Sequence, residues 1–481
     1  MAVRDDRSDV KQTTAGFRGP LMVQSLTSAK SKFLSLKIQE ECLIMNKYKN
    51  NLSNKISSKE AVIAVIGLGY IGLPLVHRFS SEGFNVIGLD INQDKVDSLN
   101  KGENYIKHLP KNLVTESIEN NFKASTDFSL IKKADALIIC VPTPLSANKD
   151  PDLSYIINAL DSMLPYLRKG QIVSLESSTY PFTTRDVVLP KLESNGLIVG
   201  QDIFLVYSPE REDPGNQNFS IRDIPKVVSG ITEHCLDLGR AVFGSIVNEV
   251  IPVSKTQTAE MVKLLENIHR AVNIGLVNEM KIVSDKMGID IHEVINAAAT
   301  KPFGFTPFYP GPGLGGYCIP IDPFYLTWKA KEFGLTTKFI ELAGEINANM
   351  PSWVVSKVAD TLNNLGKSIS KSKILVLGVA YKKNVGDLRE SPAIEIIETL
   401  IKKGANIEYS DPFVTDLKAI KNSSFNTNSI DLTEQSIANK DVVIITTDHD
   451  QFDLEFVQQN ALKIIDTRGA YKESFSNVIR A

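Results

Sequence analysis

The stretch AVIAVIGLGYIGLPLVHRF, residues 61–79, decides the fold of the amino-terminal half. Its apolar run at 61–66 predicts a buried parallel strand. Gly67, Gly69 and Gly72 follow in GxGxxG spacing, and an apolar helix begins there. In this pattern the first glycine permits a tight turn, the second lets a pyrophosphate approach the backbone, and the third lets helix and strand pack closely. The free N–H groups of the helix N-terminus would then bind the phosphates of a dinucleotide.

A second apolar segment, NVIGLD, ends at Asp90, 23 residues after Gly67. A carboxylate at this place accepts hydrogen bonds from the adenosine ribose and repels a 2′-phosphate. We therefore expect NAD rather than NADP, with Tyr70 and Ile71 of the same motif among the cofactor-binding residues. A helix N-cap is the alternative role for Asp90. The glycine spacing also occurs by chance or in purely structural turns, but here it joins a strand to a helix.

Further buried strands are predicted at 136–141, 171–176, 203–208 and 226–230. Each lies beside a helical or turn-rich segment, and this alternation predicts a doubly wound parallel sheet. Ligands bind at the C-terminal strand ends of such sheets. Polar or proline-containing loops follow the strands at 141–144, 176–181 and 208–211. Ordinary strand-ending turns have similar sequences, but three in succession favour a binding edge.

A long amphipathic helix is predicted from Thr258 to about Met287, because apolar residues recur there at steps of three and four. Lys263 and Asn267 are i,i+4 neighbours that project away from this apolar stripe. A solvated helix face is the usual interpretation of such a pair. The alternative is an active-site face, since an ammonium and an amide can together donate to one oxyanion.

The segment 302–323 contains six prolines and five glycines together with several aromatic residues. This composition predicts an ordered binding loop rather than a helix or a disordered linker. Cys318 follows Gly315 and Gly316, whose small size permits close approach of a ligand. Asp322 lies four residues further on. Cys318 is either an inert buried thiol or a nucleophile.

The strand KILVLGVA at 373–380 begins a second alternation of strands and helices, which predicts a smaller parallel sheet. Lys382, Lys383 and Arg389 lie in the loop after this strand, again at the ligand edge. Several cations there suit a phosphate group, and a solvated basic loop is the alternative. Arg468, just after another strand end, is a further candidate.

Length and composition limit the possible classes of protein. The 481 residues suggest two or three domains. The net charge of −3 argues against a nucleic-acid-binding protein but leaves room for a local basic pocket. The cysteines are far apart without a CxxC pair, so we expect no metal site or disulfide framework, and reduced thiols in the cytoplasm. They are Cys42, Cys140, Cys235 and Cys318.

The amino-terminal residues carry no targeting signal that we identify. They lack the apolar core of a signal peptide. No apolar run in the chain approaches the roughly 18–20 residues of a membrane helix, so we expect no membrane insertion. We predict a disordered extension at 1–30 and a helical segment at 31–58.

Seven motifs, in family order, resemble those of the nucleotide-sugar 6-dehydrogenase family, typified by UDP-glucose dehydrogenase. They are GLGYIGLPL, VPTP, ESSTYP, SPERE, KLLENIHRAVN, GLGGYCIPIDP and KKNVGDLRESP. The resemblance runs from about residue 30 to the end. The stretch 302–330 looks most like the branch that oxidises UDP-N-acetylglucosamine to its uronic acid. Related branches use UDP-N-acetylmannosamine, UDP-N-acetylgalactosamine or UDP-glucose, and a non-catalytic nucleotide-sugar-binding homologue is a further alternative.

The resemblance implies that the primary alcohol of the sugar is oxidised twice, with two NAD consumed. The Cys318 thiolate adds to the aldehyde, and oxidation of the thiohemiacetal gives a thioester that water hydrolyses. Lys263 and Asn267 match positions that stabilise the developing oxyanion. Asp322 matches the acid/base residue near the thiol. A 3-hydroxyacid-type NAD dehydrogenase, the competing class, would need neither Cys318 nor the second sheet.

Glu210 matches a carboxylate implicated in the hydrolysis step, but the chain departs from the family nearby. Pro214 stands where the UDP-glucose enzymes have a second glutamate, so Glu212 or Asp213 is an alternative for that role. Tyr317 stands where this branch usually has histidine before the cysteine.

The resemblance also implies the remaining ligand contacts. Thr143 and Thr179 match cofactor-loop positions. The substrate-binding set consists of Glu210, Arg211, Lys263, Asn267, Gly315, Lys382 and Arg389.

The expected architecture is α/β, with two Rossmann-like doubly wound parallel-sheet domains joined by a long central helix. We place an NAD-binding Rossmann domain at 59–255 and a UDP-sugar-binding Rossmann-like domain at 351–481. Residues 256–350 would form a central helical dimerisation domain with the catalytic cysteine loop. The family commonly dimerises through its central helix, so we expect a homodimer or a higher homo-oligomer.

Overall fold

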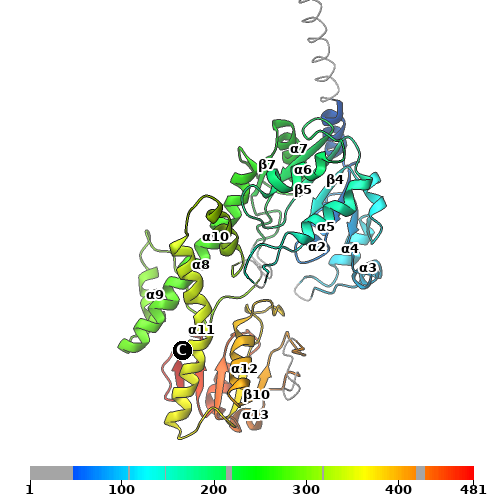
Figure 1. Cartoon of the computed structure of the whole chain (residues 1–481). Helices are drawn as coiled ribbons and strands as arrows, with labels where there is room; N and C mark the ends of the chain where they lie inside the picture. The colour runs from blue at the N-terminus through cyan, green and yellow to red at the C-terminus, as the bar shows by residue number, and fades with distance from the viewer. Residues whose placement is uncertain (1–46, 107–108, 147, 213–218, 317–318, 419–427) are drawn as a thin grey trace, which may run out of the picture.

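The computed structural model describes residues 47–481 apart from 107–108, 147, 213–218, 317–318 and 419–427. Figure 1 shows two sheet-containing units at opposite ends of the molecule, joined by long helices. The predicted fold class is confirmed, because each unit contains a largely or fully parallel sheet and a long helix lies between them.

The first sheet has eight strands in the order β3-β2-β1-β4-β5-β6-β7-β8. Its first six strands are parallel and follow the Rossmann order 3-2-1-4-5-6. The strands are β1 Val62–Ile66, β2 Asn85–Leu89, β3 Phe122–Ser125, β4 Ala136–Ile139, β5 Gln171–Leu175, β6 Ile203–Tyr207, β7 Lys226–Gly230 and β8 Val250–Pro252. The helices are α2 Gly72–Ser81, α3 Gln93–Asn100, α4 Leu113–Glu119, α5 Ser154–Met163, α6 Leu189–Glu193 and α7 Glu233–Gly244.

The last two strands of this sheet, β7 and β8, are parallel to each other and run opposite to the first six. The predicted strand at 226–230 is present as β7, but it pairs antiparallel with β6. A parallel pair requires a crossover connection, usually a helix. The described residues between β6 and β7 contain no helix, so the chain returns in the opposite direction.

The second sheet has five parallel strands in the order β10-β9-β11-β12-β13. This is the 2-1-3-4-5 order, in which the strand order reverses between β9 and β11. The strands are β9 Lys373–Leu377, β10 Asn406–Ser410, β11 Val442–Ile445, β12 Ile464–Asp466 and β13 Val478–Arg480. The helices are α12 Pro392–Lys402, α13 Glu434–Ala438 and α14 Leu454–Asn460.

Along the described part of the chain, four helices come between β8 and β9. They are α8 Thr256–Met287, α9 Ile291–Ala299, α10 Asp322–Glu332 and α11 Lys338–Asn364. The predicted long helix is therefore present as α8, which ends at Gly288 with a left-handed φ of 70°. α8 and α11 pack side by side, where a Cβ on Gly275 would lie 3.1 Å from the Cβ of Ala343.

The burial of α8 differs from what an apolar stripe suggests, because most of the stripe is exposed and part of the polar face is buried. Leu265 and Met287 of the stripe are 64% and 66% exposed. Lys263, Asn267 and Lys281 of the polar face are buried. The polar face packs against loops of both sheets, so its polar groups find partners there. Within the stripe, Ile268 is buried in a small apolar cluster and Val272 packs against it. The other members are exposed among the described residues, and they are Met261, Leu265, Leu276, Met280, Val283 and Met287.

The helix at residues 47–57 packs on the first unit. Leu52 and Ile56 are buried in the core of that unit. Lys55 donates to Asp135 at 2.9 Å. This part of the helical segment predicted at 31–58 is therefore attached to the first sheet; residues 1–46, with the predicted disordered extension, lie outside the described residues.

Candidate active site

The glycine loop after β1 has the geometry that a dinucleotide needs. Gly67 has a φ of 93°, and a Cβ there would lie 2.8 Å from the carbonyl oxygen of Cys140. A Cβ on Gly72 would lie 1.9 Å from the carbonyl oxygen of Gly67. A Cβ on Gly69 would meet nothing within 4 Å. Packing therefore explains the first and third glycines, whereas the second borders open space, which fits close approach of a phosphate group.

Asp90 holds this loop in place by hydrogen bonding. Its carboxylate accepts a hydrogen bond from the Leu68 N–H at 3.0 Å and from the Asn92 N–H at 3.0 Å. The side chain of Asn92, not of Asp90, caps α3 by accepting from the N–H of Lys95. The N-cap alternative for Asp90 is thus wrong, and its proposed contact with a ribose remains a prediction.

The two predicted cofactor threonines are both buried at C-terminal strand ends. The carbonyl of Thr143, after β4, accepts a hydrogen bond from the Tyr325 hydroxyl of α10. The hydroxyl of Thr179, after β5, lies beside that of Tyr207 but makes no hydrogen bond of good geometry among the described residues. A buried hydroxyl in this state fits a position that faces a ligand.

The buried face of α8 meets the binding edge of the first sheet at successive turns. The Glu260 carboxylate accepts from the N–H groups of Phe182 and Thr184, which fixes the start of the helix against the loop after β5. One turn later, the Lys263 ammonium donates to the main-chain carbonyl of Glu210 at 2.6 Å. The solvated interpretation of this helix face is therefore wrong, because Lys263 and Asn267 are buried, and the active-site interpretation stays a prediction.

Asn267 connects α8 to α10. Its amide donates to the carboxylate of Asp322, and its amide oxygen accepts from Arg270. Burial raises the pKa of Asp322 to about 6, while Lys263, Asn267 and Arg270 limit the rise. A carboxyl group with this pKa can gain or lose a proton near neutrality, as an acid/base group must. Arg270 is a member of this cluster that the sequence reasoning missed.

The carboxylate of Glu210 belongs to a buried triad. Its Oε2 accepts from the Lys226 ammonium at 2.7 Å, and the same ammonium donates to Glu176 at 2.5 Å. Although burial favours the neutral acid, Lys226 and the N–H groups of Arg211 and Glu212 hold the pKa of Glu210 below its usual range. Burial raises the pKa of Glu176 to about 7.

This triad was not predicted, because Glu176 and Lys226 lie in segments that otherwise look like ordinary strand ends. In the structure, Glu210 directs its carboxylate toward Lys226 and its carbonyl toward Lys263. The structure therefore places only the main chain of Glu210 at the α8 cluster.

The glycines near the predicted cysteine loop pack against the second unit. A Cβ on Gly315 would lie 2.5 Å from the Cβ of Tyr381, and one on Gly316 would meet the Tyr381 ring. The N–H of Gly316 donates to the carbonyl of Arg389 at 2.9 Å. Cys318 and Tyr317 lie outside the described residues, as do Asp213 and Pro214.

A cavity of about 360 Å³ lies where α8, this glycine loop and the second sheet meet. It brings together four predicted substrate-binding residues, Lys263, Gly315, Lys382 and Arg389. Arg270 and Arg468 also line it, so five cations surround the cavity together with one carboxylate, Glu212. The remaining lining residues are Ile274, Tyr309, Gly311, Gly313, Leu314, Gly316, Ile319 and Tyr381.

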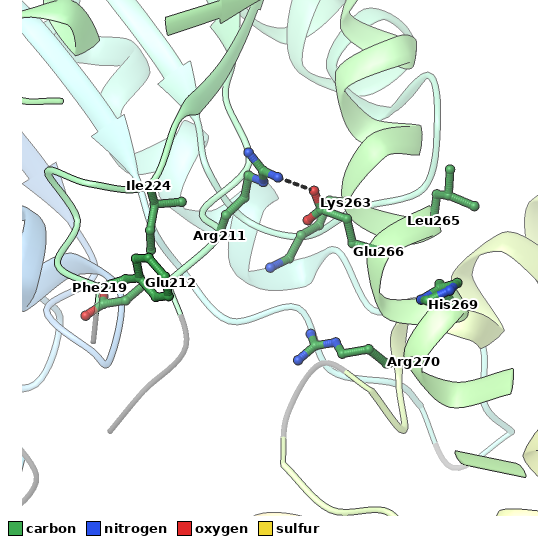
Figure 2. Close-up of a pocket in the computed structure, with 9 residues that line it drawn as sticks. All are labelled: Arg211, Glu212, Phe219, Ile224, Lys263, Leu265, Glu266, His269 and Arg270. Carbon is green, nitrogen blue, oxygen red and sulfur yellow. Dashed lines mark ion pairs between the residues drawn. The ribbon is translucent and has the colours of Figure 1, made fainter. Parts of the chain in front are cut away.

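A second cavity of about 620 Å³ adjoins the first and shares Glu212, Lys263 and Arg270 with it. Figure 2 shows Arg211 reaching across it to Glu266, with 2.6 Å between the guanidinium nitrogen and the carboxylate oxygen. Phe219, Ile224, Leu265 and His269 complete its lining. Of the predicted substrate-binding residues, Arg211 and Lys263 line this cavity.

The cations of the second sheet are oriented by main-chain and acidic groups. Arg389 pairs with Asp387, with 2.6 Å between Nη2 and Oδ2. Its guanidinium carbon lies 4.2 Å from the centroid of the Tyr70 ring, which belongs to the glycine loop of the first sheet. Arg468 donates from Nε to the carbonyl of Thr446 at 2.8 Å. Lys383, predicted with Lys382, instead pairs with Asp450 and does not line the cavity.

Comparison with known proteins matches three successive stretches of the chain to domains of one family. The NAD-binding domain of the UDP-glucose/GDP-mannose dehydrogenase family matches residues 61–247, its central domain matches 257–349 and its UDP-binding domain matches 375–473. A UDP-N-acetyl-D-mannosamine dehydrogenase of Methanococcus maripaludis is 34% identical over 394 residues, 81% of this chain and 86% of the relative. A UDP-N-acetyl-D-glucosamine 6-dehydrogenase of Pseudomonas aeruginosa is 34% identical over 359 residues, 74% of this chain and 84% of the relative.

Among solved structures, a UDP-D-ManNAc dehydrogenase from Pyrococcus horikoshii superposes with a TM-score of 0.79. It is 32% identical, and the match covers 87% of this chain and 98% of that one. The chain therefore belongs to the UDP-glucose/GDP-mannose dehydrogenase family. It is an NAD-dependent UDP-sugar dehydrogenase, and the predictions of the family and of the cofactor are confirmed. Among the described residues, no helix is long and apolar enough to cross a membrane.

Proposed function

We propose that the chain oxidises the primary alcohol of UDP-N-acetylglucosamine to the uronic acid in two steps. The observation that carries this proposal is the cavity of about 360 Å³, whose five lining cations include Lys263 of the Lys263–Asn267–Asp322 cluster. The cations suit a diphosphate, and the cluster suits an alcohol that must lose a proton. NAD, when bound on the first sheet, accepts the hydrides.

The described side chains have separate roles in the proposed reaction. Lys263 and the amide of Asn267 stabilise negative charge on the sugar oxygen, because both are buried donors on one face of α8. Asp322 takes up the proton of the alcohol, since its pKa of about 6 makes it a base at neutral pH. The hydrogen bonds of Lys263 to Glu210 and of Asn267 to Asp322 hold both donors in place.

The covalent steps are assigned to Cys318 from the resemblance and from its position in sequence. Its neighbours Gly316 and Asp322 lie at the cavity wall and in the α8 cluster, respectively. The thiolate adds to the aldehyde carbon, and the resulting thiohemiacetal carbon again carries a hydrogen that can leave as hydride. Water then cleaves the thioester to release the carboxylate and regenerate the thiol.

Glu212 is our candidate for handling the proton of that water. It lines both cavities and lies two residues beyond Glu210, whose carboxylate is engaged with Lys226. Glu210 then acts through its main-chain carbonyl, which positions Lys263. Replacement of Glu212 with glutamine is expected to slow hydrolysis and let the thioester accumulate, which mass spectrometry of the intact protein would detect.

The decisive experiment measures NADH formation with a panel of UDP-sugars. We expect two NADH per UDP-N-acetylglucosamine and little from UDP-glucose. Equal turnover of every sugar would contradict the proposed substrate, and no turnover of any would favour a non-catalytic binding protein. The Cys318→Ser variant is expected to form no uronate; unchanged complete oxidation would rule out the covalent route.

UDP-N-acetylmannosamine is the second candidate substrate. It differs from the first only in configuration at C2, and relatives named for either sugar are 34% identical to this chain. The same panel separates the two, because the preferred sugar will have the higher kcat/KM.

We further propose that the chain forms a homodimer through α8. The exposed apolar stripe of this helix, with Leu276 54% and Met280 42% exposed, would be covered by a second copy. The Leu276→Glu/Met280→Glu variant is expected to be monomeric in light scattering. A dimer of unchanged stability in this variant would contradict this interface. The exposed Lys338→Glu change on α11 is a matched control for added charge.

A further inference from the structure

We propose that the contact between Tyr70 and Arg389 couples the two ligand sites, so that dinucleotide bound on the first sheet tightens binding of a uridine diphosphate on the second. This inference rests on the proposed function, because it requires both ligands. It assigns to both residues a role in coupling, in addition to the contact that each is predicted to make with its own ligand.

The two residues belong to different units and to different predicted sites. Tyr70 lies between Gly69 and Gly72, in the loop that borders the open space for the dinucleotide. Arg389 lies in the loop between β9 and α12 and lines the cationic cavity. Each residue therefore touches the site of one ligand and a side chain from the site of the other.

The contact has the geometry of a cation–π interaction. The guanidinium carbon is 4.2 Å from the ring centroid, within the roughly 6 Å at which such attraction operates. Burial raises the pKa of the Tyr70 phenol, with the charge of Asp387 adding to the effect, so the ring stays neutral at physiological pH.

Arg389 is fixed on several sides while it faces the ring. Its Nε and Nη2 donate to Asp387 at 3.0 and 2.6 Å. Its own N–H donates to the same carboxylate at 3.1 Å, and its carbonyl accepts from Gly316 at 2.9 Å. A planar guanidinium can pair along one edge and stack on a face simultaneously. The ring thus adds a contact from the first unit to those that determine where the guanidinium points.

Coupling arises because both ligands share this ordered arrangement. A dinucleotide that orders the glycine loop also holds the Tyr70 ring, and the ring then holds the guanidinium in the cavity wall. The second ligand meets a side chain that is already ordered, so it binds more tightly. The effect must be reciprocal, because coupling free energy belongs to the pair of ligands. A single cation–π contact supports a coupling factor of about 5- to 30-fold.

The test is isothermal titration calorimetry of UDP binding to the full chain, with and without saturating NAD. This pair of ligands cannot react, so the result is independent of turnover. We expect UDP to bind about 5- to 30-fold more tightly in the presence of NAD, and NAD to gain the same factor from UDP. The Tyr70→Leu variant is expected to reduce the factor to about one, whereas Tyr70→Phe, which keeps the ring, should retain it.

The Arg389→Met variant, which removes the cation of the contact, is also expected to lose the coupling. A wild-type factor near one would overturn the proposal, as would equal coupling in Tyr70→Leu and wild type. If the coupling is found but UDP-N-acetylglucosamine is not oxidised, the proposed reaction fails and the coupling stands. If UDP does not bind the wild-type chain at all, both fail.

Discussion

The two sheets have the same arrangement where the first loop begins, but the rest of the loop differs between them. Each first strand ends in a glycine with positive φ, 93° at Gly67 and 75° at Gly378. Each neighbouring strand ends in an aspartate that accepts from main-chain N–H groups of that loop. Asp90 accepts from Leu68 in the first sheet, and Asp411 accepts from Val379 in the second.

The loops differ in the segment that comes after the glycine. In the first sheet, α2 begins at Gly72, so helix N–H groups stand at the binding edge. In the second sheet, 13 residues (379–391) precede α12, and they carry Lys382 and Arg389 into the cavity. The same scaffold therefore offers a phosphate the main chain of a helix end in one unit and side-chain cations in the other.

The longer loop of the second sheet is held by more hydrogen bonds. Asp411 accepts from four main-chain N–H groups and contacts His449, whose other ring nitrogen accepts from the N–H of Asn384 at 2.9 Å. Although burial opposes ionisation, His449 and the N–H donors hold the pKa of Asp411 below its usual range. Asp90, in contrast, accepts from two N–H groups. The longer loop of the second sheet is thus held by a carboxylate that accepts more hydrogen bonds than the one in the first sheet.

The largest effect is expected from Gly72→Ala. The new Cβ would lie 1.9 Å from the carbonyl of Gly67, so the helix must move away from the strand. We expect a loss of about 4 kcal/mol or more in the free energy of unfolding, measured with urea. Gly69→Ala is the matched control: it should change stability by less than about 1 kcal/mol but weaken NAD binding. Equal stability of the two variants would contradict the first-loop geometry.

The two aspartates provide the next test. Asp411→Ala leaves four N–H groups and a buried histidine without their acceptor, and we expect a stability loss of about 3 kcal/mol. Asp90→Ala leaves two N–H groups, and we expect a loss of about 1–2 kcal/mol. Urea unfolding of both variants measures the difference. If Asp90→Ala costs more, the second loop does not depend on its aspartate as described.

A smaller effect is expected from the cations of the second loop. Lys382→Met should raise KM for the UDP-sugar about tenfold, because one charge-assisted contact to a phosphate is lost. KM for NAD should change by less than about twofold, since the first loop binds through its main chain. Lys383→Met is the control, because Lys383 pairs with Asp450 and does not line the cavity. Similar KM values for the two variants would show that Lys382 holds no phosphate.

The smallest effect concerns pH dependence at the cluster between the two loops. The acid limb of kcat/KM is expected near pH 6, because Asp322 must be ionised to act as a base. Arg270→Met should move this limb to higher pH, since removal of a nearby positive charge raises the pKa of Asp322. Arg211→Met, which removes a cation paired with Glu266, should leave the limb in place. NADH formation across pH measures both, and an unmoved limb in Arg270→Met would exclude Asp322 as the titrating base.

The positions of Gly67 and Arg389 could be predicted because glycine spacing and strand ends are local features of the sequence. Lys263 and Asp322 were proposed from ordered motifs of the family, and the structure brings both into one buried cluster through Asn267. Lys226 and Glu176 were not, because they pair with each other across different strands. Arg270 was not, because its effect on Asp322 depends on how α10 packs on α8. The direction of the Glu210 carboxylate depends on the same distant partner, Lys226.

The sequence by itself determined the two sheets, the long helix and the residues at their binding edges. The spacing of apolar residues and the positions of glycines are local features, so they can be recognised before the tertiary structure is known. The tertiary structure alone decided which face of α8 is buried. Most of its apolar stripe is exposed, whereas Lys263, Asn267 and Lys281 are buried, because loops of both sheets and α10 supply the hydrogen-bonding partners that make burial of those polar groups possible.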